Sequence, residues 1–248
     1  MSALSTSGVV FYAVILLGAF TVRSATGFGA GLIAIPLLAL VLPVSTAVSV
    51  ASVLTTLTSI QQVSREWRLV AWRQFLIIFC YSMVGIGLGL YFLKLLDEDL
   101  LRHGLGVFMI LYSLHAVWTA DTVHVLPSRW HGTIGAVVGI VGGLCSALFG
   151  AGAGPFYVVY FGILRLDRAV FRATMSAVVV LGGVARIAGY ESAGFYGAST
   201  LGLLAVGLPA VIAGCWLGDK VVYRLSARSF SRLVAAIMLL SGITLLIR

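Results

Sequence analysis

Two glycine-rich segments carry residue types suited to binding a small anion. The first reads Gly27-Phe28-Gly29-Ala30-Gly31 and the second reads Gly150-Ala151-Gly152-Ala153-Gly154, and each lies between two apolar runs. Glycine lets a ligand approach the main chain, and a helix that begins after such a break presents free N–H groups and the positive end of its dipole. The pattern predicts two helix ends that favour anions. The alternative is that these glycines only permit close packing of helices in a membrane.

Arg23 lies just ahead of the first glycine segment, at the end of an apolar run. If it lies deep in a membrane, its guanidinium costs about 2.5–3.5 kcal/mol on insertion scales unless it is paired or hydrated. An anionic ligand would supply a partner, so Arg23 is a candidate binding residue. If the preceding helix is instead a tilted span, Arg23 reaches an interface and has no binding role.

A row of polar residues follows the first glycine segment. Ser52, Thr55, Ser59 and Gln62 have the spacing of one helical face, and Gln61 is adjacent to them. These side chains are candidates to line a polar passage. The alternative is that Ser and Thr bond to their own helix or to a neighbour, which explains the glutamines less well.

Three arginines of the second half each have two interpretations. Arg186 aligns with Val63 when the chain is shifted by 123 residues. It therefore either supplies a second cation near the site or lies at the outer surface. Arg168 and Arg172 follow a short apolar run, where they either attract anions to an entrance or only fix the orientation of the chain.

Catalysis and metal binding have no support in the sequence. All eight acidic residues fall in predicted connections or at helix ends, so no intramembrane carboxylate indicates a proton relay or a cation site. The four histidines lack metal-ligand spacing, and neither a Walker A sequence nor a Ser, His and Asp set is recognisable. We therefore predict a protein that is not an enzyme and that uses no cofactor and no metal.

The composition places these residues in a lipid bilayer. Apolar residues fill 60% of the 248 positions and charged residues fill 10%, whereas soluble domains carry about 45–50% and about 25% respectively. The net charge of +8 does not indicate nucleic-acid binding, because no basic stripe interleaves with aromatic residues. The expected partners are the bilayer and a small anion, and no motif indicates or excludes a homodimer.

The chain is predicted to contain two copies of one helical unit. A shift of 123 superposes the two glycine segments with four identities in five, and a shift of 129 pairs Gly85 and Gly89 with Gly214 and Gly218. We divide the chain into a first membrane repeat, 1–123, and a second, 124–248, which together form one domain. Helices are expected at 8–23, 30–42, 47–63, 72–93, 104–118, 132–148, 154–164, 171–187, 200–218 and 230–247.

The first two expected helices of repeat one are shorter than a comfortable bilayer span. Runs of about 15 and 13 residues rise about 22 and 20 Å, against a hydrocarbon core of roughly 30 Å. They form either a hairpin that dips in and returns, which inverts the second repeat, or tilted spans. Inversion puts eleven Lys and Arg on one side and four on the other, whereas four crossings per repeat give nine and six. The positive-inside rule favours inversion, with the eleven charges in the cytoplasm and both termini outside.

The predicted fold class is therefore an all-α polytopic membrane protein of two inverted repeats. Each repeat has a broken pair of short helices plus about three full transmembrane helices. In such proteins the broken helices of both halves meet near the midplane and coordinate the substrate. We expect the two glycine segments to face each other there.

The glycine segments and their surroundings resemble the TauE/SafE sulfite-exporter family, whose halves each carry a glycine-rich break ahead of a short apolar helix. The match continues to Pro36 in the first half and through Val170-Phe171-Arg172-Ala173-Thr174 in the second. One departure is Val159, which the repeat alignment places opposite Pro36. The resemblance implies transport of sulfite, sulfonates such as sulfoacetate, or other small sulfur-containing anions across a bacterial cytoplasmic (inner) membrane, often by export.

The predicted function is a secondary transporter of such anions that works by alternating access. Two alternatives stay open. One is an anion channel with the same electropositive centre, and the other is a membrane scaffold whose glycines only pack helices.

Overall fold

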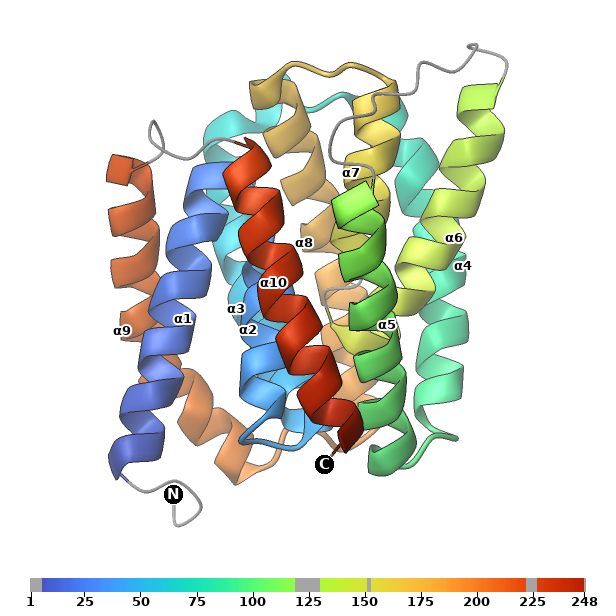
Figure 1. The fold of residues 1–248 in the computed structure, drawn as a ribbon. Helices are drawn as coiled ribbons and strands as arrows, with labels where there is room; N and C mark the ends of the chain where they lie inside the picture. The colour runs from blue at the N-terminus through green and yellow to red at the C-terminus, as the bar shows by residue number, and fades with distance from the viewer. Residues whose placement is uncertain (1–5, 119–129, 151–152, 222–226, 248) are drawn as a thin grey trace.

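The computed structural model describes residues 6–118, 130–150, 153–221 and 227–247, and its elements there are all helices. Figure 1 shows long helices that run side by side between two ends of one bundle. The predicted all-α membrane fold is confirmed, and each expected helix is present. In chain order the elements are α1 (Thr6–Thr26), α2 (Ala30–Ala39), α3 (Val44–Glu66), η1 (Trp67–Leu69), α4 (Trp72–Leu93), α5 (Glu98–Trp118), α6 (His131–Phe149), α7 (Ala153–Ile163), α8 (Arg168–Ser192), α9 (Ala198–Val221) and α10 (Ala227–Ile247).

The outside of the bundle has the character that lipid requires. Large apolar side chains cover it: Val14 is 62% exposed, Val84 54% and Ile212 67%. In water such a surface would aggregate, whereas hydrocarbon solvates it. By length and composition, five described segments are candidates to cross a membrane: Val44–Leu69, Trp72–Leu93, His131–Phe149, Arg168–Ser192 and Ala198–Lys220.

The prediction that both helices of each broken pair are short was wrong for the first member. α1 has 21 residues and α6 has 19, hence about 32 and 29 Å at a rise of about 1.5 Å per residue. α1 continues past Arg23, so this residue lies in the last turn of the helix. A cation there complements the helix dipole and does not end the helix. Only α2 and α7, with 10 and 11 residues, are short.

The two broken pairs return to opposite ends of the bundle. Figure 1 shows α2 descending to the end at which α1 begins, whereas α7 rises to the end at which α6 begins. α1 begins and α10 finishes at the same end. This arrangement favours the predicted inversion, which stays a prediction.

Left-handed backbone at the breaks explains why glycine occupies them. φ is 85° at Gly27, 96° at Gly29 and 68° at Gly150, and a side chain is strained at such values. The turns therefore need glycine. Two residues of the second glycine segment, Ala151 and Gly152, lie outside the described residues.

Packing between the halves occurs in matched pairs. On α4, a Cβ at Gly85 would lie 2.9 Å from the backbone N of Leu144 on α6; on α9, a Cβ at Gly214 would lie 3.2 Å from the backbone N of Thr21 on α1. The two glycines differ by 129 in number and their neighbours by 123, the offsets found in the sequence. The same contact therefore occurs twice, with the roles of the halves exchanged.

A second matched contact covers the breaks themselves. The side chain of Arg172 lies on Gly27, and that of Val48 lies on Gly150, where an added Cβ would be 3.0 Å from the Cβ of Val48. The glycines differ by 123 and the covering residues by 124. Two copies related by a two-fold axis would produce this pattern. The repeat limits 1–123 and 124–248 stay a prediction, and their junction lies outside the described residues.

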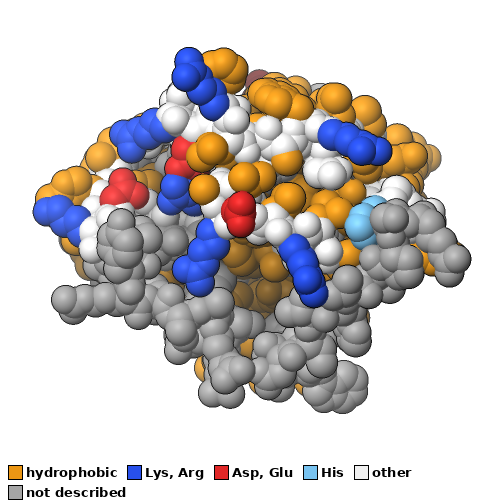
Figure 2. Space-filling model, turned by 90° about the horizontal axis from the view of Figure 1, so that it is seen from above, with side chains coloured by type: hydrophobic (Ala, Val, Ile, Leu, Met, Phe, Trp, Pro, Cys, Tyr) orange, Lys and Arg blue, Asp and Glu red, His pale blue; other side chains and the backbone are white. Residues whose placement is uncertain are grey.

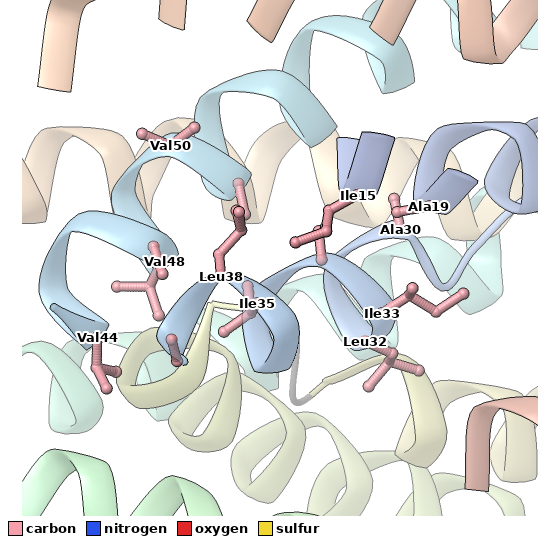
Figure 3. Packing of buried hydrophobic residues seen from close by; sticks show 14 of the residues in the cluster. Ile15, Ala19, Ala30, Leu32, Ile33, Ile35, Leu38, Val44, Val48 and Val50 are labelled. Carbon is pink, nitrogen blue, oxygen red and sulfur yellow. The ribbon is translucent and has the colours of Figure 1, made fainter. Parts of the chain in front are cut away.

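The short helix α2 is the centre of the core. Nine of its ten residues are buried, and Figure 3 shows its Ile35 and Leu38 lying between Ile15 of α1 and Val48 of α3. An apolar helix of this length cannot span a bilayer by itself. Its burial fixes the height at which the first break stands.

We predict that Gly85→Ala lowers the stability of the protein and that Gly87→Ala, two residues along α4, does not. The methyl group at position 85 collides with the backbone of α6, whereas nothing lies within 4 Å of a Cβ at 87. Overpacking of this kind costs about 1–3 kcal/mol. Thermal unfolding midpoints in detergent measure the difference. Equal midpoints for the two variants would contradict the close α4–α6 contact.

Candidate anion-binding site

A cavity of about 540 Å³ lies between α1, α3, α8 and α9. It is near the end of the bundle at which α3 and α9 finish and α8 begins (Figure 1). Three arginines and two carboxylates contribute to its lining, which leaves one net positive charge. The polar lining residues are Arg23, Ser24, Thr58, Gln61, Gln62, Arg65, Glu66, Arg172 and Asp219.

Arg23 lines the deep part of this cavity. Only 4% of the residue is exposed, and its guanidinium donates a hydrogen bond to the hydroxyl of Ser59. That hydroxyl donates in turn to the carbonyl of Thr55 at 2.7 Å, so its lone pairs point to Arg23. No carboxylate among the described residues forms a salt bridge with this arginine. Its five N–H donors therefore hold a positive charge that faces the cavity without a counter-charge in contact.

An ion pair stands at the cavity mouth. Arg172 donates to Glu66 from both Nε, at 3.2 Å, and Nη2. The stem of Arg172 also lies over Gly27, so one side chain joins the first break to the end of α3. Arg168, by contrast, is exposed at the first residue of α8 and does not line the cavity. Whether either arginine attracts anions stays a prediction.

The polar row on α3 divides between cavity and core. Gln61 and Gln62 line the cavity, and Gln62 Oε1 accepts a hydrogen bond from Ser176 Oγ of α8 at 3.0 Å. Ser52 and Thr55 are buried below it. Thr55 Oγ1 donates to the carbonyl of Ala51 at 2.6 Å. For Thr55 the structure therefore agrees with the alternative that the hydroxyls of this row bond to their own helix. The glutamines are the members of the row that a ligand reaches.

The glycine segments lie behind the cavity. None of their described residues lines it, and Ala30 and Gly31 are buried in the core of α2. The two segments do meet: a Cβ at Gly154 would lie 3.8 Å from the ring of Phe28. Ala153 begins α7.

Arg186 is buried, so the surface interpretation of this residue was wrong. It is 5% exposed on α8 and donates to the hydroxyl of Ser146 near the end of α6. Its Nε makes no hydrogen bond within the described residues. The alignment with Val63 did not reveal its partner. The shift of 123 pairs Ser146 with Arg23, a relation that could have identified this serine from the sequence.

The comparisons decide the family. The model of the sulfite exporter TauE/SafE family matches residues 11–245, nearly the whole chain. This chain belongs to the TauE/SafE family. No curated protein and no solved structure matches it. Family membership implies exporter-type transport of sulfite or related anions, and the apolar helices agree with a multi-pass membrane protein.

The cavity of this TauE/SafE protein opens near a basic end of the bundle. Figure 2 shows Lys and Arg side chains gathered over this end, with acidic side chains among them. Of the eleven cations predicted for the cytoplasmic side, Arg129 and Arg224 lie outside the described residues. The positive-inside rule would place this end in the cytoplasm.

We predict that a membrane-impermeant maleimide labels Gln61→Cys from the Arg65 side and does not label Ser52→Cys from that side. Both variants are made on α3 in a background in which Cys80, Cys145 and Cys215 are serine. Residue 61 is exposed in the cavity, whereas Ser52 is 0% exposed. Gel-shift labelling in sealed vesicles measures both rates. Similar rates for the two variants would show that the cavity does not end where this structure places its floor.

Proposed function

We propose that this TauE/SafE protein is a secondary exporter of small sulfur-containing anions, such as sulfite or sulfoacetate, and that Arg23 binds the anionic group. The observation that carries the proposal is a buried arginine that lines a cavity and whose guanidinium donates to a hydroxyl, with no salt bridge to a carboxylate in the described part of the chain. A guanidinium at membrane depth needs a counter-charge or water. A substrate anion in the cavity satisfies that need.

The surrounding groups suit an oxyanion. A guanidinium offers paired N–H donors that match two oxygens of a sulfonate or sulfite group. The amides of Gln61 and Gln62 supply further donors on the same wall. A volume of about 540 Å³ exceeds that of a small anion, so water accompanies it, each molecule taking about 30 Å³.

The position of the cavity agrees with export as the proposed direction. With the basic end in the cytoplasm and both termini outside, the cavity collects anions from the cytoplasm of a bacterial cell and releases them across the cytoplasmic membrane. No ATP-binding motif is recognisable in the sequence, so an ion or substrate gradient drives the cycle. Alternate exposure of the site by movement of one repeat against the other is the expected mechanism.

We predict that Arg23→Gln lowers the transport of radiolabelled sulfoacetate and sulfite into proteoliposomes, whereas Arg168→Gln does not. Loss of a charged hydrogen bond costs about 1.5–3 kcal/mol, which corresponds to about a 10- to 100-fold rise in KM. Arg168 is the matched control, because it is an exposed arginine at the same end outside the cavity. Arg23→Lys keeps the charge and is expected to retain partial uptake.

The dependence of uptake on concentration distinguishes the competing functions. Saturable uptake that requires Arg23 supports the transporter. Flux that rises without saturation and is carried as current would indicate an anion channel instead. Absence of uptake for both anions by the native protein would contradict the proposal and favour a scaffold role.

A further inference from the structure

Arg186 is a second buried cation that the open cavity does not use. It does not line that cavity, and no described carboxylate forms a salt bridge with it. It lies near the hydroxyls of Tyr157 and Tyr190, yet none of the residues that the structure describes accepts a hydrogen bond from its Nε. An arginine buried in a bilayer without a counter-charge is rare and marks a functional site by default.

The positions of Arg186 and its partner repeat those of two cavity residues. Ser146 follows Arg23 by 123, and Arg186 follows Gln62 by 124. The offset of 123 also relates the two break glycines, Gly27 and Gly150, and the offset of 124 relates the side chains that lie over them. The pair Arg23 and Gln62 in the first half thus corresponds to the pair Ser146 and Arg186 in the second, and each pair contains one arginine. In the first half the arginine is on the helix before the break, and in the second half it is on the long helix after the break.

A buried hydroxyl follows the same relation. Ser176 donates to Gln62 in the cavity wall at 3.0 Å, and Ser52 precedes Ser176 by 124. Ser52 is fully buried beside Tyr190, and Tyr190 is one helical turn from Arg186 on α8. Ser52 and Arg186 thus both lie beside Tyr190 in the core.

Tight packing closes the region between these groups and the opposite end. Leu90 of α4 lies against Gly189 of α8, where an added Cβ would be 2.9 Å from the Cγ of Leu90. One turn earlier on α4, Ile86 lies against Gly182 of α8, where an added Cβ would be 3.4 Å from the Cδ1 of Ile86. Two large apolar side chains of one helix thus fill the space that two glycines of the other leave.

The counterparts of these four residues stand apart. The offsets of 129 and 124 relate Leu90 to Asp219 and Gly189 to Arg65. In the same way they relate Ile86 to Cys215 and Gly182 to Thr58. All four counterparts line the open cavity. The structure is therefore open in one half and closed at the corresponding place in the other.

We propose that Arg186, Ser146 and Ser52 form a second binding site for the same small anion, in a passage that this structure holds closed with Leu90 and Ile86 on the two glycines. The inference rests on the proposed function. The second site takes the anion when α4 separates from α8 and the first cavity closes. Arg186 then does on the opposite side what Arg23 does here.

A reversible lock on the closed passage tests the proposal. Leu90→Cys and Gly189→Cys are combined in the background without native cysteines, and the reach of Leu90 Cγ to position 189 fits the spacing of about 3.5–4.5 Å between Cβ atoms in disulfides. Oxidation is expected to reduce sulfoacetate uptake to that of empty liposomes while equilibrium binding to the open cavity persists, and dithiothreitol restores uptake. Sulfoacetate is used because sulfite itself cleaves disulfides. Each single cysteine variant is the control.

The proposal would be overturned if the oxidised protein, with its cross-link verified by mass, took up sulfoacetate as fast as the dithiothreitol-reduced protein does. Arg186 variants test it without a cross-link. Arg186→Gln is expected to reduce uptake about tenfold or more, the factor that corresponds to about 1.4 kcal/mol, with an unchanged unfolding midpoint and partial rescue by Arg186→Lys. Uptake by Arg186→Gln within about twofold of native would also overturn it.

The two proposals fail in distinguishable ways. If the native protein transports neither anion, or if Arg23→Gln transports normally, the proposed function falls. If transport requires Arg23 but is indifferent to both the cross-link and Arg186→Gln, only the second site falls.

Discussion

The fold depends on the cost of holding a guanidinium charge in a low-dielectric interior. Two arginines, Arg23 and Arg186, are almost completely buried, and the hydrogen-bond partner that the structure gives each of them is a serine hydroxyl. A hydroxyl accepts a hydrogen bond but neutralises no charge, so each site keeps a positive potential. In a soluble protein a carboxylate would fill this role. Among the described residues no carboxylate forms a salt bridge with either arginine, and in the proposed function an anion takes that place.

Close helix packing joins four of the helices into two pairs. Glycines such as Gly85 and Gly214 bring α4 onto α6 and α9 onto α1 at backbone distance, which is how helices associate in membranes without a hydrophobic driving force. The pairs α1 with α9 and α4 with α6 thereby become stiff units. The proposed movement then occurs at the two other seams, between α3 and α9 and between α8 and α4, where side chains rather than backbones meet. The cavity opens at the first of these seams and apolar packing fills the second.

Sequence analysis identified the elements well and the contacts less well. The glycine pattern located both breaks because left-handed backbone needs glycine, and Arg23, Gln61 and Gln62 were found because polar residues are costly in an apolar run. The length of α1 was mispredicted, since Arg23 was taken as the end of a helix that its charge stabilises. Ser59 was predicted only as a member of the polar row, and Ser146 was missed although the offset of 123 pairs it with Arg23. Neither serine was assigned to an arginine, because a serine in a membrane helix usually bonds to its own backbone.

The two halves carry their buried arginine on different helices, and this difference matters for the proposed cycle. Had both halves carried it on the helix before the break, Arg23 and its counterpart would occupy equivalent places on the rigid α1–α9 and α4–α6 units. Instead Arg186 is on α8, the long helix that borders the second seam. Opening that seam separates α8 from α4 and exposes the cation to water and anions on the far side. An anion bound there repays the solvation that burial removed, so substrate stabilises the opened state, as a ligand must in order to shift a conformational equilibrium.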